Sequence, residues 1–382
     1  MIQNKNEWEF PYCPIESDWK LNWNQLYNQF KWIKSLEGTL QDPIFHAEGD
    51  VLAHTKKVCE SLIRLQEWRL IGEPGRSILF AAALLHDIAK PICTRVDNDH
   101  ITSKGHALKG ELLAREILYK AEGFEYKVPF EEREMTVKLV RFHGLPLFFL
   151  ERNNPIQSVI EASQIVRMDW LALLAKSDAL GRICPDQNEL LERINLFSEF
   201  CEEQECYKCA RKFADSHSRF IYFQRENGNP DYKAFDDTRF TVILMSGLPA
   251  AGKDTFIERN YPDLPVVSLD KLRDELDISP EDDQGLVVQT AKEMAKKMLR
   301  ENKPFVWNAT NLTKIMRRQL ISLFTSYGAK VKVVYLEAPY QEILKRNRER
   351  ARSVPEKVIN RMITKLEVPD ITEAHEVQWS VE

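Results

Sequence analysis

The spacing of apolar residues divides the chain into a helical first half and a second half in which strands alternate with helices. In the first half, apolar positions recur every three or four residues. The helices they predict span residues 19–36, 51–68, 78–90, 106–120 and 131–142. Residues 94–102 predict a short hairpin about Asp97 and Asn98. Residues 187–225 are charged and again helical in pattern, so the whole first half is expected to be α-helical.

The second half begins with an apolar strand over residues 241–245, which runs into a glycine-bounded loop and a helix. Further strands are predicted over 264–268, 305–307 and 331–336, with helices from 270 and over 287–300, 314–327 and 339–352. This alternation predicts a parallel α/β sheet with its site at the carboxyl ends of the strands. Turn residues at 225–231 and 236–238 place the boundary near residue 235. We therefore expect two domains, residues 1–235 and 236–382.

Composition narrows the class of protein. Apolar content of 43% and charged content of 29% are typical of a globular protein. No apolar run reaches the ~18–20 residues of a membrane helix, and the first residues lack a signal-peptide pattern. We expect a cytoplasmic protein without a membrane partner. The net charge of −5 argues against a generally basic surface, so any contact with nucleic acid should be local.

The seven cysteines are irregularly spaced and do not predict a disulfide framework. Cys201, Cys206 and Cys209 could supply four zinc ligands together with His217. The last spacing is unusual for zinc, which favours reduced cysteines that bind no metal.

A phosphate-binding loop is predicted after the first strand of the second half. Gly247, Gly252 and Lys253 have the spacing G-x-x-x-x-G-K. The glycines let successive backbone N–H groups point at phosphate oxygens, and Lys253 reaches the terminal phosphates. The residue after the lysine is Asp254, where Ser or Thr usually contacts magnesium, so either Asp254 or Thr255 is expected to bind it. The loop predicts binding of ATP, or another nucleoside triphosphate, with Mg²⁺.

Three more polar clusters follow predicted strands, where a parallel sheet would bring them together. Asp270 closes the second strand, with Arg273 three residues later on the same helix face. The third strand ends in Asn308, Thr310 and Asn311. Residues 345–352 are strongly basic, and Arg346 and Arg350 share a face. Such a helix is usually a solvated surface, but beside a phosphate loop it favours an arginine-bearing lid that neutralises transition-state charge.

The order of these parts resembles the 5′-hydroxyl polynucleotide kinases of phage and bacterial end-healing enzymes, over about residues 240–366. The resemblance implies that Asp270 is the general base and that Arg273 contacts the acceptor's phosphate. It implies that Arg350 binds the donor phosphates, with Arg346 as a second candidate. A magnesium ligand is the rival role for Asp270. The family has Ser at the position of Asp254, which leaves the metal ligation open.

Histidines in the first half form a second set of candidates. His86 and Asp87 lie in an apolar segment, and a buried ionisable pair needs partners or a metal. The order His54, His86-Asp87, His106, His143 and Asp178 resembles the HD phosphohydrolase superfamily. Local segments over about residues 44–182 look like the HD domain attached to bacterial tRNA nucleotidyltransferases. The resemblance implies that these six residues bind one or two divalent metals.

Imidazole and carboxylate ligands suit manganese, iron, nickel, cobalt or zinc, and a carboxylate such as Asp87 can bridge two ions. Lys90 lies three and four residues beyond the His86-Asp87 pair. It is either a phosphate-binding residue for the polynucleotide or a solvated lysine at a helix end. His46 also belongs to the local resemblance, and whether it contacts metal or substrate stays open.

Together the two halves resemble the bacterial fusion of an HD phosphoesterase with a polynucleotide kinase. The implied architecture is an all-α HD domain, with a core over 44–182 and an extension over 187–225, followed by an α/β P-loop kinase domain with a parallel sheet. One half would phosphorylate 5′-hydroxyl ends of RNA or DNA, and the other would hydrolyse 2′,3′-cyclic phosphate or 2′/3′-phosphate ends. A separate polynucleotide ligase would join the products.

Two other functions stay open. The chain could be a small-metabolite kinase fused to a nucleotide phosphohydrolase. Alternatively, an ATP-binding module in the second half could regulate the HD phosphohydrolase without transferring phosphate.

Overall fold

The computed structural model describes residues 8–98, 100–279, 282–350 and 352–382. The chain forms two compact units, Met1–Arg211 and Lys212–Glu382. The boundary precedes helix α13 (Ser216–Gln224), whose Phe220 is part of the core of the second unit. Helix α13 therefore groups with the second unit, whereas the sequence predicts a boundary near 235. Asp99 of the expected hairpin and Ala351 of the basic segment lie outside the described residues.

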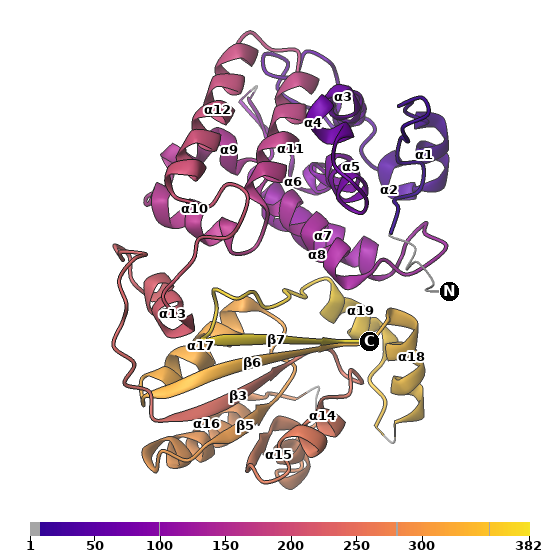
Figure 1. Cartoon of the computed structure of the whole chain (residues 1–382). Helices are drawn as coiled ribbons and strands as arrows, with labels where there is room; N and C mark the ends of the chain where they lie inside the picture. Colours follow the sequence, from indigo (N-terminus) through magenta and orange to yellow (C-terminus); the bar gives the residue numbers. More distant parts are fainter. Residues whose placement is uncertain (1–7, 99, 280–281, 351) are drawn as a thin grey trace, which may run out of the picture. The chain divides into compact units, whose positions relative to one another are not determined.

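The first unit is built from helices around one apolar core (Figure 1). Helix α3 (Val51–Arg64) packs against α11 (Met168–Gly181) and α5 (Gly75–Leu85), and α8 (Phe130–Phe142) packs against α5 and α7 (His106–Tyr119). The remaining helices are α1 (Trp23–Gln29), α2 (Lys31–Lys34), α4 (Gln66–Arg69), α6 (Lys90–Cys93), α9 (Leu145–Phe148), η1 (Phe149–Glu151), α10 (Pro155–Ser163) and α12 (Gln187–Glu203). The expected hairpin is confirmed as antiparallel strands β1 (Arg95–Asp97) and β2 (His100–Thr102).

Two of the expected helices are divided in the structure. The helix expected over 78–90 ends at Leu85, and His86 and Asp87 lie in the turn before α6. The helix expected over 19–36 is interrupted at Phe30, whose backbone is extended with φ −99° and ψ 101°. The Phe30 ring is fully buried and lies 5.0 Å from the Trp32 ring, centroid to centroid. Aromatic packing therefore overrides the helical periodicity at this position.

The second unit is a parallel α/β domain, as the sequence predicts. Its sheet has the order β4-β5-β3-β6-β7, and the neighbouring strands are parallel (Figure 1). The strands are β3 (Phe240–Ser246), β4 (Val266–Ser268), β5 (Phe305–Asn308), β6 (Ala329–Glu337) and β7 (Glu376–Val381). The helices besides α13 are α14 (Lys253–Asn260), α15 (Leu269–Glu275), α16 (Gly285–Arg300), α17 (Lys314–Thr325), α18 (Tyr340–Glu349) and α19 (Glu356–Ile363).

Strand β3 occupies the centre of the sheet, and Val242, Leu244 and Met245 are fully buried. A continuous apolar run of this kind is typical of a strand covered on both faces. Strand β7 and helix α19 were not predicted from the sequence. Within the described residues, none of the helices combines the length and the apolar character that crossing a bilayer requires.

Candidate phosphate-binding and metal sites

The loop between β3 and α14 requires glycine at Gly247. Its φ is +144°, and a Cβ there would lie 2.4 Å from the Leu336 carbonyl oxygen of strand β6. Gly252, at the end of the same loop, has φ +90°, but a Cβ there would meet no heavy atom within 4 Å. The first glycine therefore allows the loop to pass close to β6, and the second allows a left-handed backbone before helix α14 begins.

The polar segment after β5 supports this loop from within the domain. The Gly247 backbone N–H donates to the Thr310 carbonyl at 2.9 Å, and the Ser246 hydroxyl donates to the Asn311 carbonyl at 3.1 Å. The Asn311 side-chain amide donates to the Met245 carbonyl at 2.7 Å, and Asn311 is only 2% exposed. Asn311, which the sequence placed in the polar cluster of the site, thus holds the strand from which the phosphate loop departs.

The Lys253 ammonium lies inside the loop and donates to the carbonyls of Gly247 and Leu248 at 3.1 and 2.8 Å. Burial lowers the pKa of Lys253 to about 8. The negative charges of Asp254 and Asp270 act to raise this pKa, while Arg350 acts to lower it. The charges of these three residues thus act on Lys253, as expected for groups near the carboxyl ends of the strands of one parallel sheet.

Asp254 and Thr255 both lie in the first turn of α14 and are exposed. The Asp254 carboxylate accepts a hydrogen bond of 2.6 Å from the side-chain amide of Asn308, the last residue of β5. This contact holds Asp254 next to the carboxyl end of β5, where its carboxylate could bind a magnesium ion at the phosphate loop. Both residues stay candidates for the metal.

Asp270 lies in the first turn of α15, and Ser268 caps the helix by accepting a hydrogen bond from the Lys271 N–H at 3.4 Å. The Asp270 side chain is 75% exposed and forms an ion pair with Arg273. The Arg273 Nε also donates to the Gln284 side chain at 2.6 Å. The pair lies on one helix face, as the spacing predicts, and the carboxylate is open to solvent.

The two candidate lid arginines have different surroundings. Arg346 forms ion pairs with Glu342 at 2.8 Å and Glu382 at 2.6 Å. Arg350 lies just beyond the end of α18, is exposed and has no ion-pair partner within the part of the chain that the structure describes. Arg350 is therefore the better candidate for contacting donor phosphates.

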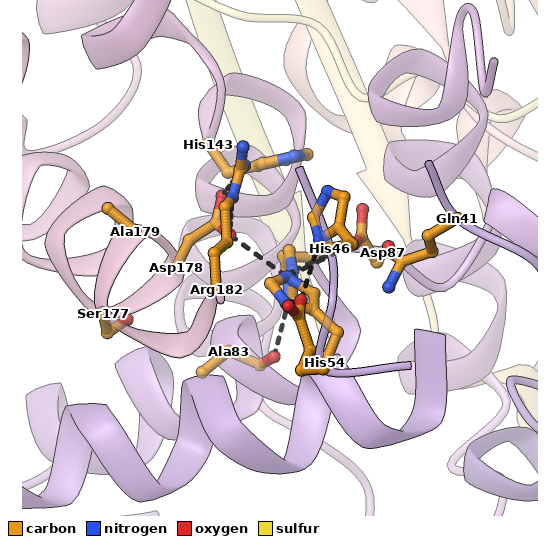
Figure 2. Close-up of polar contacts among 12 residues, drawn as sticks. Gln41, His46, His54, Ala83, Asp87, His143, Ser177, Asp178, Ala179 and Arg182 are labelled. Atoms are coloured by element: carbon orange, nitrogen blue, oxygen red, sulfur yellow. Dashed lines mark hydrogen bonds and ion pairs between the residues drawn. The ribbon is translucent and has the colours of Figure 1, made fainter. Parts of the chain in front are cut away.

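In the first unit, the residues expected to bind metal converge from different elements (Figure 2). His54 Nε2 lies 3.1 Å from Asp178 Oδ1 and 3.4 Å from His86 Nε2. Asp87 Oδ2 lies 3.2 Å from His86 Nε2 and 3.8 Å from His54 Nε2. We refer to His54, His86, Asp87 and Asp178 as the first metal group.

The second metal group consists of Asp87, His106 and His143. Asp87 Oδ1 lies 3.4 Å from His106 Nε2, which lies 3.2 Å from His143 Nε2. The two oxygens of Asp87 thus face different groups, which is the arrangement a bridging carboxylate requires. The two groups bring together all six residues of the resemblance.

Hydrogen bonds on the far side of each ring orient the histidines. The Nδ1 atoms of His86, His106 and His143 lie 2.7–2.8 Å from the carbonyls of Ala83, Ser103 and Val140. A carbonyl can only accept, so each Nδ1 carries the proton, and Nε2 of a neutral ring presents its lone pair to the other ligands. Facing lone pairs repel each other unless a cation lies between them, so the donor set fits divalent metals.

The surroundings of these residues keep Asp87 and Asp178 ionised and His143 neutral. Burial would raise the pKa of Asp87, but Lys90 and His86 hold it well below its usual value. Burial opposes the ionisation of Asp178 likewise, and Arg182 keeps its pKa well below the usual range. Burial, His106 and His86 lower the pKa of His143 to about 3. Two ionised carboxylates and a neutral imidazole are the forms that bind metals.

Lys90 is 8% exposed, and its ammonium contacts Asp87 Oδ2 and the Gln41 side-chain oxygen, both at 2.7 Å. It therefore lies within the site and not on a solvated helix end. His46 Nδ1 lies 2.8 Å from Glu48 Oε1, and Glu48 Oε1 also lies 2.7 Å from His54 Nδ1. Glu48 was not selected from the sequence. Its position six residues before a candidate histidine ligand was the available signal.

The seven cysteines are free thiols, and Cys201 and Cys206 are buried while Cys209 is exposed. The groups of potential metal ligands found among the described residues contain none of these three cysteines. His217 lies in the second unit, where its Nε2 donates to the Phe235 carbonyl at 3.2 Å.

The glycine loop, the parallel sheet and the charged side chains at the strand ends define the second unit as a P-loop α/β domain of the kinase type. Residues 242–369 match the family described as AAA domain. The L-seryl-tRNA(Sec) kinase of Methanococcus maripaludis is 26% identical over 136 residues, which cover 34% of this chain and 53% of that protein. The chain thus spans about half the length of this curated relative.

Solved structures similar to the chain include a gluconokinase from Sinorhizobium meliloti, with 16% identity and a TM-score of 0.28. The alignment covers 37% of this chain and 82% of that one. A sugar kinase from Janibacter sp. has 17% identity and a TM-score of 0.28, over 38% of this chain and 84% of that one. Scores this low define neither an activity nor a substrate.

Proposed function

We propose that the chain is a bifunctional nucleic-acid end-healing enzyme. The second unit would transfer the γ-phosphate of ATP to the 5′-hydroxyl of RNA or DNA. The first unit would hydrolyse 2′,3′-cyclic phosphate or 2′/3′-phosphate ends with the help of divalent metals. Hydrolysis of a cyclic phosphate leaves a 2′- or 3′-phosphate, and removal of a 3′-phosphate by a second hydrolysis leaves a 3′-hydroxyl. A separate polynucleotide ligase would then join the healed 3′ end to the new 5′-phosphate.

The observation that supports the kinase half is the geometry of the phosphate loop, in which Gly247 passes close to β6 and the Lys253 ammonium lies against the carbonyls of Gly247 and Leu248. The charges of Asp254, Asp270 and Arg350 act on the pKa of this lysine. Lys253 and the loop N–H groups would hold the donor phosphates, and Arg350 would neutralise charge that develops during transfer. The exposed Asp270 would take the proton from the acceptor hydroxyl once Arg273 turns to the acceptor's phosphate. Asp254 or Thr255 would contact the magnesium that accompanies ATP.

The convergence of four Nε2 atoms and two carboxylates supports the phosphoesterase half. Divalent ions held there would supply a bound hydroxide at neutral pH and neutralise phosphate charge. The chain's own histidines and carboxylates fix the ions, while Lys90 lies close enough to Asp87 to contact a phosphate oxygen at the same site.

The kinase half is tested by transfer of labelled γ-phosphate from ATP to a 5′-hydroxyl oligonucleotide. We expect labelled RNA or DNA, and loss of about 10²–10⁴-fold in rate for Asp270→Asn, the range for a general base. Arg350→Ala should lose about 10³-fold. Arg346→Ala is the matched control, because its charge is already paired with Glu342 and Glu382. Equal losses in the two arginine variants would contradict the role given to Arg350.

A different acceptor is a specific alternative, because the curated relative is a kinase named for seryl-tRNA. The same assay with a seryl-tRNA and with small hydroxylated metabolites would detect it. Binding of ATP without transfer to any acceptor would instead support a regulatory module. The phosphoesterase half is tested with an oligonucleotide that ends in a 2′,3′-cyclic phosphate, and unchanged hydrolysis by Asp87→Asn would refute the assignment.

A further inference from the structure

Glu48 contacts two histidines with a side chain that has 0% exposure to solvent. Its Oε1 accepts hydrogen bonds from His54 Nδ1 at 2.7 Å and from His46 Nδ1 at 2.8 Å. Its Oε2 accepts from the Ile183 backbone N–H at 2.8 Å. Three donors therefore converge on one buried carboxylate, which is an arrangement that stabilises its ionised form.

The bond to Glu48 determines which nitrogen of His54 is available to a metal. Because Nδ1 donates to the carboxylate, the neutral ring presents Nε2, which faces Asp178 Oδ1 at 3.1 Å and Asp87 Oδ2 at 3.8 Å. A carboxylate behind an imidazole also makes the opposite nitrogen a stronger donor to a metal. The other three histidines of the metal groups have a neutral backbone carbonyl in this place. Within the metal groups, His54 alone is supported by a charged group.

Glu48 also connects the two helices that carry ligands of the first metal group. His54 belongs to α3 and Asp178 to α11. Besides the bond from Ile183 N–H to Glu48, the Ala47 N–H donates to the Ile183 carbonyl at 3.0 Å. The guanidinium of the neighbouring Arg182 donates two hydrogen bonds to the Asp178 carboxylate, at 3.0 and 2.7 Å. The segments that carry Glu48 and Arg182, which orient His54 and Asp178, are thus joined to each other through Ile183.

We propose that Glu48 is the positioning residue of the first metal group, orienting His54 for metal binding, and that His46 is held by Glu48 outside the metal set. This rests on the metal-dependent half of the proposed function. Among the described residues, neither of the groups of potential ligands that include Asp87 contains His46. Its Nδ1 donates to Glu48, and its ring lies edge-on to the His54 ring with centroids 4.8 Å apart. His46 therefore lies beside the first metal group, next to His54.

The test is a titration of the metal-free full-length protein with Mn²⁺ and with Co²⁺, followed by calorimetry and by the visible absorption of Co²⁺. Glu48→Gln keeps the size of the side chain but removes the charge, and its single amide oxygen can accept from the histidines or from the Ile183 N–H but not on both sides. We expect metal affinity to fall about 10–100-fold, the usual effect of removing such a partner. The Co²⁺ spectrum should change as well, which a general loss of stability would not cause.

His46→Gln is the matched control, because it leaves the contact between Glu48 and His54 in place. Its metal affinity should stay within about threefold of the wild-type value, well below the effect of removing a metal partner. Glu48→Asp, which keeps the charge on a shorter side chain, should lie between Glu48→Gln and the wild type in affinity. It also provides a measurement if Glu48→Gln does not fold.

Wild-type affinity and an unchanged Co²⁺ spectrum in Glu48→Gln would overturn the proposal. Equal losses in His46→Gln and Glu48→Gln would overturn the placement of His46 outside the metal set. The wild-type protein could bind metal, and the variants could have the expected effects, while no 2′,3′-phosphate end is hydrolysed. That outcome would refute the proposed phosphoesterase activity and leave the role of Glu48 supported. A wild-type protein that binds no divalent ion would overturn both.

Discussion

Substituting the two glycines of the phosphate loop separates the effect of steric overlap from that of backbone conformation. In Gly247→Ala, the new Cβ would lie 2.4 Å from the Leu336 carbonyl oxygen, about 1 Å closer than the 3.4 Å at which ordinary van der Waals contact begins. Leu336 belongs to β6, which pairs with β3 on one side and β7 on the other, so it cannot move away easily. The loop must shift instead.

The expected loss of stability follows from the backbone conformation and from the steric overlap. A φ of +144° is a region that non-glycine residues occupy at a cost of about 1–3 kcal/mol, and the overlap adds to it. In Gly252→Ala, a left-handed backbone costs about 1–2 kcal/mol, and no neighbouring atom adds an overlap. The midpoint of thermal unfolding of the second unit should therefore fall more in Gly247→Ala, at about 2–4 °C per kcal/mol for a domain of this size.

Calorimetric unfolding and ATP titration of both variants provide the measurement. We expect Gly247→Ala to lose ATP binding by about 100-fold or more, equivalent to about 2.7 kcal/mol, and Gly252→Ala to lose less. The transition of the first unit should stay at the wild-type temperature in both variants. Equal stability and equal ATP affinity in the two variants would show that the close approach to Leu336 is unimportant, which would refute this reasoning.

Three further predictions concern charge and metal. Because burial lowers the pKa of Lys253 to about 8, the ammonium loses its charge as the pH rises from 7 to 9, and ATP affinity should weaken about tenfold. ATP titrations should find no such change in Lys253→Arg. An ATP affinity of the wild-type protein that does not depend on pH would contradict this. Arg317 is fully buried and pairs with Glu373 at 2.7 Å, so Arg317→Met should lower the free energy of unfolding by about 3–5 kcal/mol in a denaturant titration. The Arg317→Met/Glu373→Gln double variant should recover part of that loss. A loss equal to the sum of the losses in the two single variants would argue against a stabilising interaction between Arg317 and Glu373. Chelation followed by return of Mg²⁺ alone, and Asp87→Asn, should each abolish hydrolysis of 2′,3′-phosphate ends. ATP binding by the second unit, measured with Mg²⁺ present, should persist, and its loss would contradict separate sites.

The parts that the sequence predicted well are those with a local signal. Strand β3, the loop and helix α14 follow from an apolar run and the spacing of Gly247, Gly252 and Lys253. The candidate metal residues were selected from short segments whose order could be compared with a known family, and their binding of metal stays a prediction. Both signals depend on residues close in sequence, so neither required knowledge of how distant segments pack.

The remaining features depend on long-range packing. Strand β7 lies at the sheet edge and consists of exposed and half-buried residues, so its apolar signal is weak. The break at Phe30 results from aromatic neighbours that periodicity does not specify. Asn311 resembled a site residue because it follows a strand, and only its contact with Met245 identifies it as support. Glu48 gains its place from a bond to a residue 135 positions later.

The contacts beneath the phosphate loop have a mechanical consequence. Met245, Ser246 and Gly247 are each bonded to residue 310 or 311, and the Arg317 guanidinium donates to the Asn311 carbonyl at 3.0 Å. Opening the loop would break these bonds together and uncover the buried Arg317. In hydrogen exchange, the loop and the start of α17 should therefore open as one cooperative unit. These shared bonds are expected to make the phosphate loop stiff.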